Sequence, residues 1–175
     1  MRIDRVWAMP SMHTFTILPI KQLLLEEMGQ DELWIDPFAG ENSLAKITND
    51  LNPNKPTMYH MQALDFLKMF DDESVDGVLY DPPYTLRQVK ECYDEFGIDI
   101  SWDGRCTFWS DQLDEIRRIV KPHGKLIKFG YNSNGAGNQR EFTMTRILLV
   151  PHGGPHNDTI VTVEEKQNNK VKRLF

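Results

Sequence analysis

The feature that most constrains the fold is the alternation of short apolar segments with helical ones along the first two thirds of the chain. The segments that we expect to form strands there are residues 32–35, 46–51, 57–61, 75–80 and 125–131. Helical periodicity occurs at 19–28, 66–70 and 112–120. Strands 142–150 and 159–164 then flank a turn, whereas residues 1–11 have no clear periodicity. This order predicts an α/β fold, a mostly parallel sheet with an antiparallel hairpin at its edge.

Length and composition limit the chain to one domain. A chain of 175 residues with 40% hydrophobic residues can bury a core of its own. Its two cysteines, Cys92 and Cys106, argue against a disulfide framework and suit a reducing compartment. The apolar runs are too short to cross a bilayer, and the first residues do not resemble a secretory signal. We therefore expect a single domain, residues 1–175, in the cytoplasm and away from membranes.

The net charge of −6 excludes a protein that holds nucleic acid by charge alone. It is compatible with an enzyme that has a local basic face. Two clusters are candidates for that face: Arg117, Arg118, Lys121, Lys125 and Lys128, and Lys166, Lys170, Lys172 and Arg173. Ordinary solvated surface explains both clusters equally well.

The strongest chemical signal is the tetrapeptide Asp81-Pro82-Pro83-Tyr84, directly after an apolar strand. The prolines fix the backbone, and Asp81 projects a carboxylate from the end of the strand, where open α/β sheets place their ligands. The Pro82 carbonyl stays free to accept a hydrogen bond, and Tyr84 offers an aromatic face. Two acceptors beside a stacking ring suit an exocyclic amino group on a nucleobase. A rigid turn that caps the strand is the structural alternative.

This tetrapeptide resembles the signature of the DNA amino-methyltransferases, which act on adenine N6 or cytosine N4. The resemblance implies a reduced-size version of the Rossmann-like class I methyltransferase fold. It implies S-adenosylmethionine as the cofactor. It also implies catalytic roles for Asp81, Pro82 and Tyr84, with Tyr84 contacting the target base. No metal is implied, and His152 and His156 are kept from helical spacing by the intervening Gly-Gly-Pro.

A second segment, Asp36-Pro37-Phe38-Ala39-Gly40, resembles the cofactor motif of the same family. Gly40 would let the backbone approach the methionine part of the cofactor, and Asp36 and Phe38 are assigned to cofactor binding with it. The next residues, 41–43, depart from the family's pattern, and the following helix is short or missing. Upstream, Thr14 and Phe15 belong to a stretch that resembles the N-terminal cofactor motif.

Two further acids match cofactor-binding positions of the family. Asp50, at the end of a candidate strand, corresponds to the residue that holds the ribose hydroxyls, with a turn cap as the alternative. Asp65 corresponds to the acid near the adenine amino group, and a helix N-cap is the alternative there. The cofactor and catalytic motifs together span residues 12–84.

The chain has no room for a separate target-recognition domain. The irregular stretch 85–110 is the candidate for target contact, with Trp102, Arg105 and Trp109 as the contact residues. A lid over the cofactor explains the same stretch equally well.

The resemblance implies methylation of adenine N6 in DNA, with the target base flipped out of the duplex, by a small stand-alone enzyme of the kind found in bacteria and phage-infected cells. A cytosine-N4 DNA enzyme, an RNA adenine enzyme and an inactive cofactor-binding regulator are the alternatives. A short or degenerate target is expected, and a homodimer is a candidate arrangement for completing it.

Overall fold

The computed structural model describes residues 1–168, without the side chains of Trp102, Asp103 and Arg105. A seven-stranded sheet runs through the molecule in the order β1-β6-β7-β5-β4-β2-β3. The strands are β1 (Arg2–Arg5), β2 (Trp34–Asp36), β3 (Ile47–Thr48), β4 (Val75–Tyr80), β5 (Val120–Gly130), β6 (Phe142–Val150) and β7 (Thr159–Lys166). β7 pairs antiparallel with both β5 and β6, and the other neighbours pair in parallel. The mostly parallel sheet with its antiparallel hairpin is confirmed, and β1 adds a parallel strand outside the hairpin.

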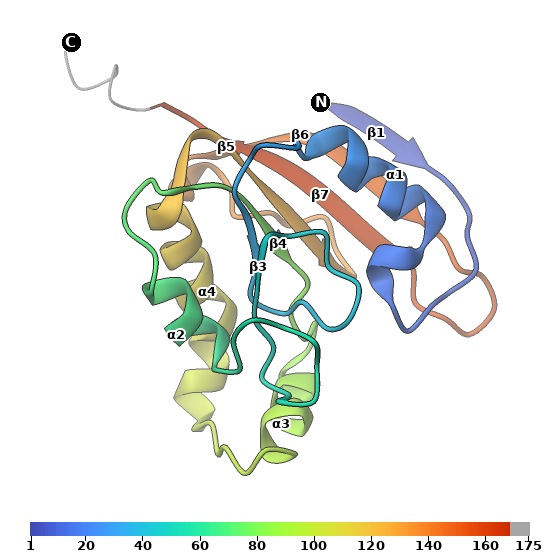
Figure 1. Cartoon of the computed structure of the whole chain (residues 1–175). Coiled ribbons are helices and arrows are strands. Elements are labelled where there is room, and N and C mark those ends of the chain that lie inside the picture. Colours follow the sequence, from blue (N-terminus) through green and yellow to red (C-terminus); the bar gives the residue numbers. More distant parts are fainter. Residues whose placement is uncertain (169–175) are drawn as a thin grey trace.

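Helices cover both faces of the sheet, as Figure 1 shows. The helices are η1 (Thr14–Thr16), α1 (Leu18–Glu27), α2 (Ala63–Lys68), α3 (Leu86–Asp94), α4 (Trp102–Ile119) and η2 (Asn138–Arg140). Alternate residues of each strand point to opposite faces. On β4, Leu79 packs with α1 in one core cluster, and Val78 and Tyr80 pack with α2 and α4 in the other. The sheet is therefore buried on both faces, which explains the continuous apolar run of β4.

The sequence indicated that the helix after the cofactor motif is short or missing. The structure has no helix there, and residues 37–46 form a loop. The third strand expected at 57–61 is wrong. Only one isolated parallel bridge, between Asn49 and Tyr59, remains there. The Asn49 side chain holds this region, because its amide donates to the Met61 carbonyl (2.9 Å) and its oxygen accepts from the Met61 N–H (3.0 Å).

The stretch 85–110 is not irregular, because it contains α3 and the first half of α4. A capping box starts α3: the Thr85 hydroxyl accepts from the Gln88 N–H, and the Gln88 side chain accepts from the Thr85 N–H. Ser101 caps α4 through a bond from the Gly104 N–H. Tyr93 of α3 and Phe108 of α4 pack together, ring centroids 5.7 Å apart, in a small core of their own.

Two strand boundaries also differ from the expectation. Residues 2–5 form β1, although their side chains are mostly exposed, because the backbone pairs with residues 146–149 of β6. β5 begins at Val120 instead of residue 125. Its pairing with β4 skips from Val75–Val120 to Gly77–Lys125, so residues 121–124, which separate the expected helix and strand, form a bulge within the strand.

Candidate functional site

Three carboxylates meet at one edge of the sheet. Asp36 ends β2, Asp50 follows β3 and Asp81 follows β4, and these strands are neighbours that run in parallel. The carboxyl ends of parallel strands are where ligands bind in open α/β sheets. The structure therefore brings together three acids that lie up to 45 positions apart in the sequence.

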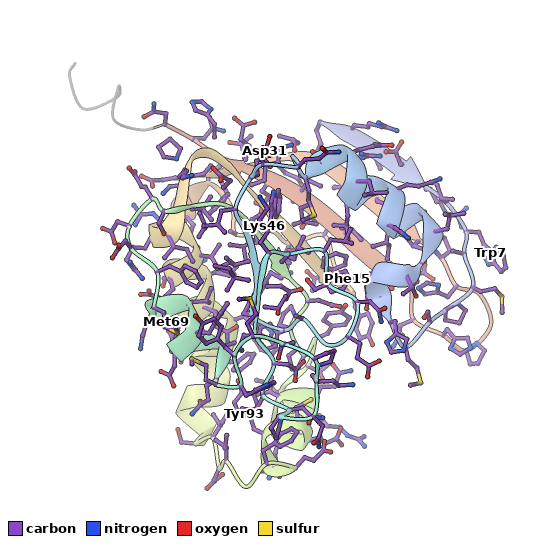
Figure 2. The ribbon with its side chains drawn as sticks, viewed as in Figure 1. Trp7, Phe15, Asp31, Lys46, Met69 and Tyr93 are labelled. Atoms are coloured by element: carbon purple, nitrogen blue, oxygen red, sulfur yellow. The ribbon has the colours of Figure 1, made fainter. Side chains whose placement is uncertain are left out.

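Two adjoining cavities open at this edge. The larger, about 410 Å³, is lined by Phe38, Asp50, Asp81 and Tyr84 among others. The smaller, about 110 Å³, is lined by Thr14, Phe15, Gly40 and Asp81 among others. Phe38 and Asp81 border both cavities, so one ligand can extend past them from one cavity to the other. Figure 2 labels Phe15 of η1, which lines the smaller cavity, and Tyr93 of α3, which lines the larger one.

Asp36 is fully buried and lines neither cavity. Its carboxylate accepts from the Phe38 N–H (2.9 Å) and from the Ser43 hydroxyl (2.6 Å), so it fixes the loop that carries Phe38 and Gly40. Burial raises the pKa of Asp36 to about 7, and the charges of Asp81 and Asp50 add to this shift. The structure thus gives Asp36 a positioning contact and no direct exposure to a ligand.

Asp50 lines the larger cavity with both oxygens already in backbone hydrogen bonds. One oxygen accepts from the Gly40 N–H (3.1 Å) and the other from the Asn52 N–H (2.8 Å). Each carboxylate oxygen has a second lone pair, so the pair can still accept from two hydroxyl groups. Gly40 has φ +56°, and no atom lies within 4 Å of where its Cβ would be. This backbone conformation favours glycine, and the absence of a side chain leaves the loop open toward the smaller cavity.

Asp81 is half-buried and held by two side chains. The Tyr84 hydroxyl donates to it, and the Thr14 side chain makes a second hydrogen bond. Burial raises the pKa of Asp81 above its ordinary range, against the opposing effect of these two bonds. Burial and the Asp81 charge also raise the pKa of Tyr84, which therefore stays a protonated donor. Asp81 is thus a carboxylate with enhanced proton affinity, at the junction of the two cavities.

The two prolines differ in what their carbonyls do. The Pro83 carbonyl accepts from the Trp109 indole N–H (2.8 Å), which ties the tetrapeptide to α4. Within the described part of the chain, the Pro82 carbonyl accepts no hydrogen bond. Pro82, Tyr84 and Trp109 also line a third cavity, of about 290 Å³, together with Lys128 and residues that follow β5. The tetrapeptide is therefore the wall between this third cavity and the larger one.

The stretch 85–110 contributes a wall to the larger cavity through α3. Gln88, Cys92 and Tyr93 line it, which agrees with a lid over a ligand in that cavity. Trp109 lines the third cavity, whereas the side chains of Trp102 and Arg105 lie outside the described residues. Asp65 is an exposed residue in the first turn of α2 and is not among the residues that line these cavities. The N-cap of that helix is Gln62, so Asp65 is not a cap either.

Sequence reasoning missed several lining residues, namely Leu51, Lys55, Met61, Ala63 and Tyr93. They come from loops, from the first residue of α2 and from α3, and the positions of these segments depend on long-range packing. The capping box of Thr85 and Gln88 was the one local signal that could have revealed the α3 wall.

No protein-family model matches the chain. Over 92 residues the chain is 33% identical to the Type II methyltransferase M.BamHI of Bacillus amyloliquefaciens. That match covers 52% of this chain, which spans about a fifth (21%) of the relative's length.

Solved structures resemble most of the chain. The 1,6-didemethyltoxoflavin-N1-methyltransferase of Burkholderia thailandensis has a TM-score of 0.58 at 13% identity and covers 86% of this chain and 77% of its own. TrmN from Thermus thermophilus has a TM-score of 0.59 at 16% identity, covering 86% of this chain and 49% of its own. These likenesses concern the backbone arrangement. The chain therefore has the Rossmann-like fold of class I S-adenosylmethionine-dependent methyltransferases.

Proposed function

We propose that the protein is an S-adenosylmethionine-dependent methyltransferase that methylates the N6 amino group of adenine in DNA. The observation that carries the proposal is the position of the tetrapeptide 81–84 between cavities: Asp81 lines the larger cavity, and Pro82 and Tyr84 line both that cavity and the third one. A methyl donor on one side and a base on the other would both contact this wall. The partial identity to a Type II methyltransferase and the fold support the methyl-transfer class.

The residues of the two adjoining cavities fit S-adenosylmethionine. Asp50 can accept from ribose hydroxyls, and the apolar lining of Leu51, Met61 and Ala63 suits the adenine ring. The smaller cavity, beside Thr14 and Gly40, would take the methionine end. The cofactor carries a positive sulfonium, which favours a cavity that has the Asp50 carboxylate in its lining. We assign Thr14, Phe15, Phe38, Gly40 and Asp50 to direct contact, and Asp36 to positioning.

When bound, this cofactor supplies a methyl group on sulfur, and the electron pair of the breaking carbon–sulfur bond stays on the sulfur. The chain has to make the amino nitrogen a better nucleophile, because its lone pair is delocalised into the base. Hydrogen bonds from the amino group to Asp81 and to the Pro82 carbonyl would localise that lone pair as the new carbon–nitrogen bond forms. The nitrogen then loses one proton, for which Asp81 is the acceptor, and its raised pKa suits that role.

The third cavity is where we place the target base. An adenine inside a duplex cannot reach the Asp81 wall, so the base would be flipped out, with Tyr84 taking over its stacking. The third cavity has aromatic walls and a volume of about 290 Å³, which suits a single flat base. Adenine is preferred because the Asp-Pro-Pro-Tyr form of the motif is typical of adenine enzymes in the family that the sequence resembles.

The test is incubation of the protein with S-adenosylmethionine labelled in the methyl group and with DNA, RNA or neither. Label in DNA supports the proposal. Label in RNA alone would mean that the substrate is RNA and not DNA. Cofactor binding without transfer to either nucleic acid would favour a regulatory protein that has lost catalysis. Asp81→Ala is the control, because it should bind the cofactor and transfer nothing.

A further inference from the structure

The loop that follows β5 forms one side of the third cavity. Tyr131 begins this loop, and its side chain is 41% exposed although it is aromatic. Its ring packs edge-on against Tyr84, with the centroids 4.6 Å apart and the ring planes 78° apart. An exposed ring is thus placed directly beside the ring that we assign to the target base.

A buried carboxylate holds this loop in place. Glu164 on β7 is 1% exposed, and it accepts from the Ala136 N–H (2.6 Å) and the Gly137 N–H (3.1 Å). A Cβ at Gly135 would overlap the Glu164 carboxylate, so only glycine lets the loop pass there. Burying a carboxylate costs free energy unless it is hydrogen-bonded. The two loop N–H groups satisfy Glu164, so these bonds hold the loop against β7.

Lys128 adds a second anchor from β5. Its ammonium donates to the Asn134 carbonyl (2.8 Å), and the Glu164 charge attracts it. The loop is therefore tied to the sheet at three points between Asn134 and Gly137. Tyr131 lies between these anchors and the end of β5, so its position beside Tyr84 is set in advance.

We infer that Tyr131 is a positioning residue for the target base, acting with Tyr84 as a pair of crossed aromatic walls. The inference rests on the proposed function. Because the two planes are 78° apart, a flat base that stacks on one ring meets the other ring with its edge. Two such contacts fix both the tilt and the in-plane position of the base, and so aim its amino group at the Asp81 wall.

The test compares the methylation rates of three Tyr131 variants on a DNA duplex that the wild type methylates. Tyr131→Phe keeps the ring, Tyr131→Leu keeps apolar volume, and Tyr131→Ala removes both. We expect Tyr131→Phe to methylate at nearly the wild-type single-turnover rate, and the Leu and Ala variants to lose about 5- to 100-fold, as for loss of base stacking. Affinity for S-adenosylmethionine should stay unchanged, because Tyr131 does not line the two adjoining cavities. Trp7→Ala is the matched control, since Trp7 is also an exposed aromatic residue (60%) and lines none of the three cavities.

A duplex with an abasic site at the target position separates positioning from structure. With no base to hold, Tyr131→Ala should bind this duplex as tightly as the wild type does, and it should bind the intact target more weakly. Equal weakening on both duplexes, or a Leu variant at the wild-type rate, would overturn the role of Tyr131 and leave the proposed function standing. A wild type that methylates no DNA would instead overturn the proposed function, and this inference with it.

Discussion

Asp81 has two neighbours that hold it in place before any substrate arrives, the Tyr84 hydroxyl and the Thr14 side chain. Asp81→Ala removes the carboxylate from the wall but leaves Asp50 in the larger cavity and Gly40 in the smaller one. We expect methyl transfer to be lost and S-adenosylmethionine binding to stay nearly intact, as measured by calorimetric titration. Loss of binding in parallel with activity would mean that Asp81 belongs to the cofactor site instead.

The raised pKa of Asp81 also predicts a pH dependence. The ionised carboxylate is the form that accepts hydrogen bonds from an amino group, so the single-turnover rate should rise with pH. The rise should occur above the ordinary aspartate range near 3.9. A rate that is already at its plateau at pH 4, measured where the fold is intact, would contradict this assignment.

Asp50 and Asp65 provide a matched pair, because both were candidates for cofactor contact and only Asp50 lines the larger cavity. We expect Asp50→Ala to weaken S-adenosylmethionine binding by about 1.5–3 kcal/mol, the range for hydrogen bonds to a charged group. Asp65→Ala should leave the dissociation constant unchanged. The reverse order of effects would place the ribose contact on Asp65.

Asp36 predicts how stability depends on pH. Its pKa is about 7 in the fold against an ordinary value of 3.8, so the folded chain binds more protons between these values. The free energy of unfolding should therefore fall as pH rises from about 4 to about 7. At about 1.4 kcal/mol per tenfold change in proton affinity, this contribution is on the order of 4 kcal/mol. Denaturant titrations at several pH values should show a flatter profile for Asp36→Asn; parallel profiles would contradict the prediction.

Helix α3, which forms one wall of the larger cavity, is joined directly to the tetrapeptide 81–84. The Gln88 side chain accepts from both the Tyr84 N–H (2.8 Å) and the Thr85 N–H (3.1 Å), so the capping box that starts α3 also holds Tyr84. Thr85→Ala should cost about 0.5–2 kcal/mol of stability and also weaken cofactor binding. Ser101→Ala removes the comparable cap of α4, away from the cavities, and should cost stability alone. Equal cofactor affinity in the two variants would separate α3 from the cofactor site.

The elements that the sequence predicted correctly are those whose signal is local. The apolar run of β4 and its Asp-Pro-Pro-Tyr end predicted both the strand and the loop that follows it. Strand β1 was missed because its side chains are mostly exposed and because it depends on pairing with β6, whose residues lie more than 140 positions later in the sequence. Helix α3 was missed because, in nine residues, it buries only Val89 and Tyr93.

The candidate site follows the same division. Its acids could be predicted from the motifs, because each one follows a strand. Its walls could be predicted only in part: Trp109 was a candidate contact residue, whereas Tyr93 and Tyr131 are brought there by tertiary packing. The position of Asp36, inside the loop instead of in a cavity, likewise depends on the Ser43 and Phe38 contacts.

For the whole molecule, charge limits how DNA could be held. Four residues of the first basic cluster form ion pairs: Arg117 with Glu141, Arg118 with Asp72 and Glu115, Lys121 with Asp76, and Lys125 with Glu27. The other cluster extends to Lys170, Lys172 and Arg173, which lie outside the described residues.

No helix within residues 1–168 has the length and apolar character needed to cross a membrane.

Since four of the five cations in the first cluster are held in ion pairs, we predict modest, salt-sensitive DNA affinity that rests on a few phosphate contacts, and a short or degenerate target. Each phosphate contact contributes about 0.9 to the slope of log K against log salt, so titrations at several salt concentrations would count the contacts. Each bidentate base contact adds only about 1–3 kcal/mol of discrimination, and a second copy of the chain is one way to add more. A long, strictly defined recognition sequence read by a monomer would contradict this prediction. So would full activity after alanine replaces Trp102, Arg105 and Trp109 together.

The most direct measurement of the central claim is nucleoside analysis of DNA after incubation with S-adenosylmethionine that carries a deuterated methyl group. The DNA is unmethylated before the incubation. Its digestion to nucleosides afterwards, followed by mass spectrometry, identifies the base and the nitrogen that received the label. We expect deuterated N6-methyldeoxyadenosine with the wild type and none with Asp81→Ala. Label on cytosine N4 would preserve the mechanism and correct the base, whereas a wild type that leaves DNA unlabelled, or an Asp81→Ala variant that labels it, would contradict the proposed function.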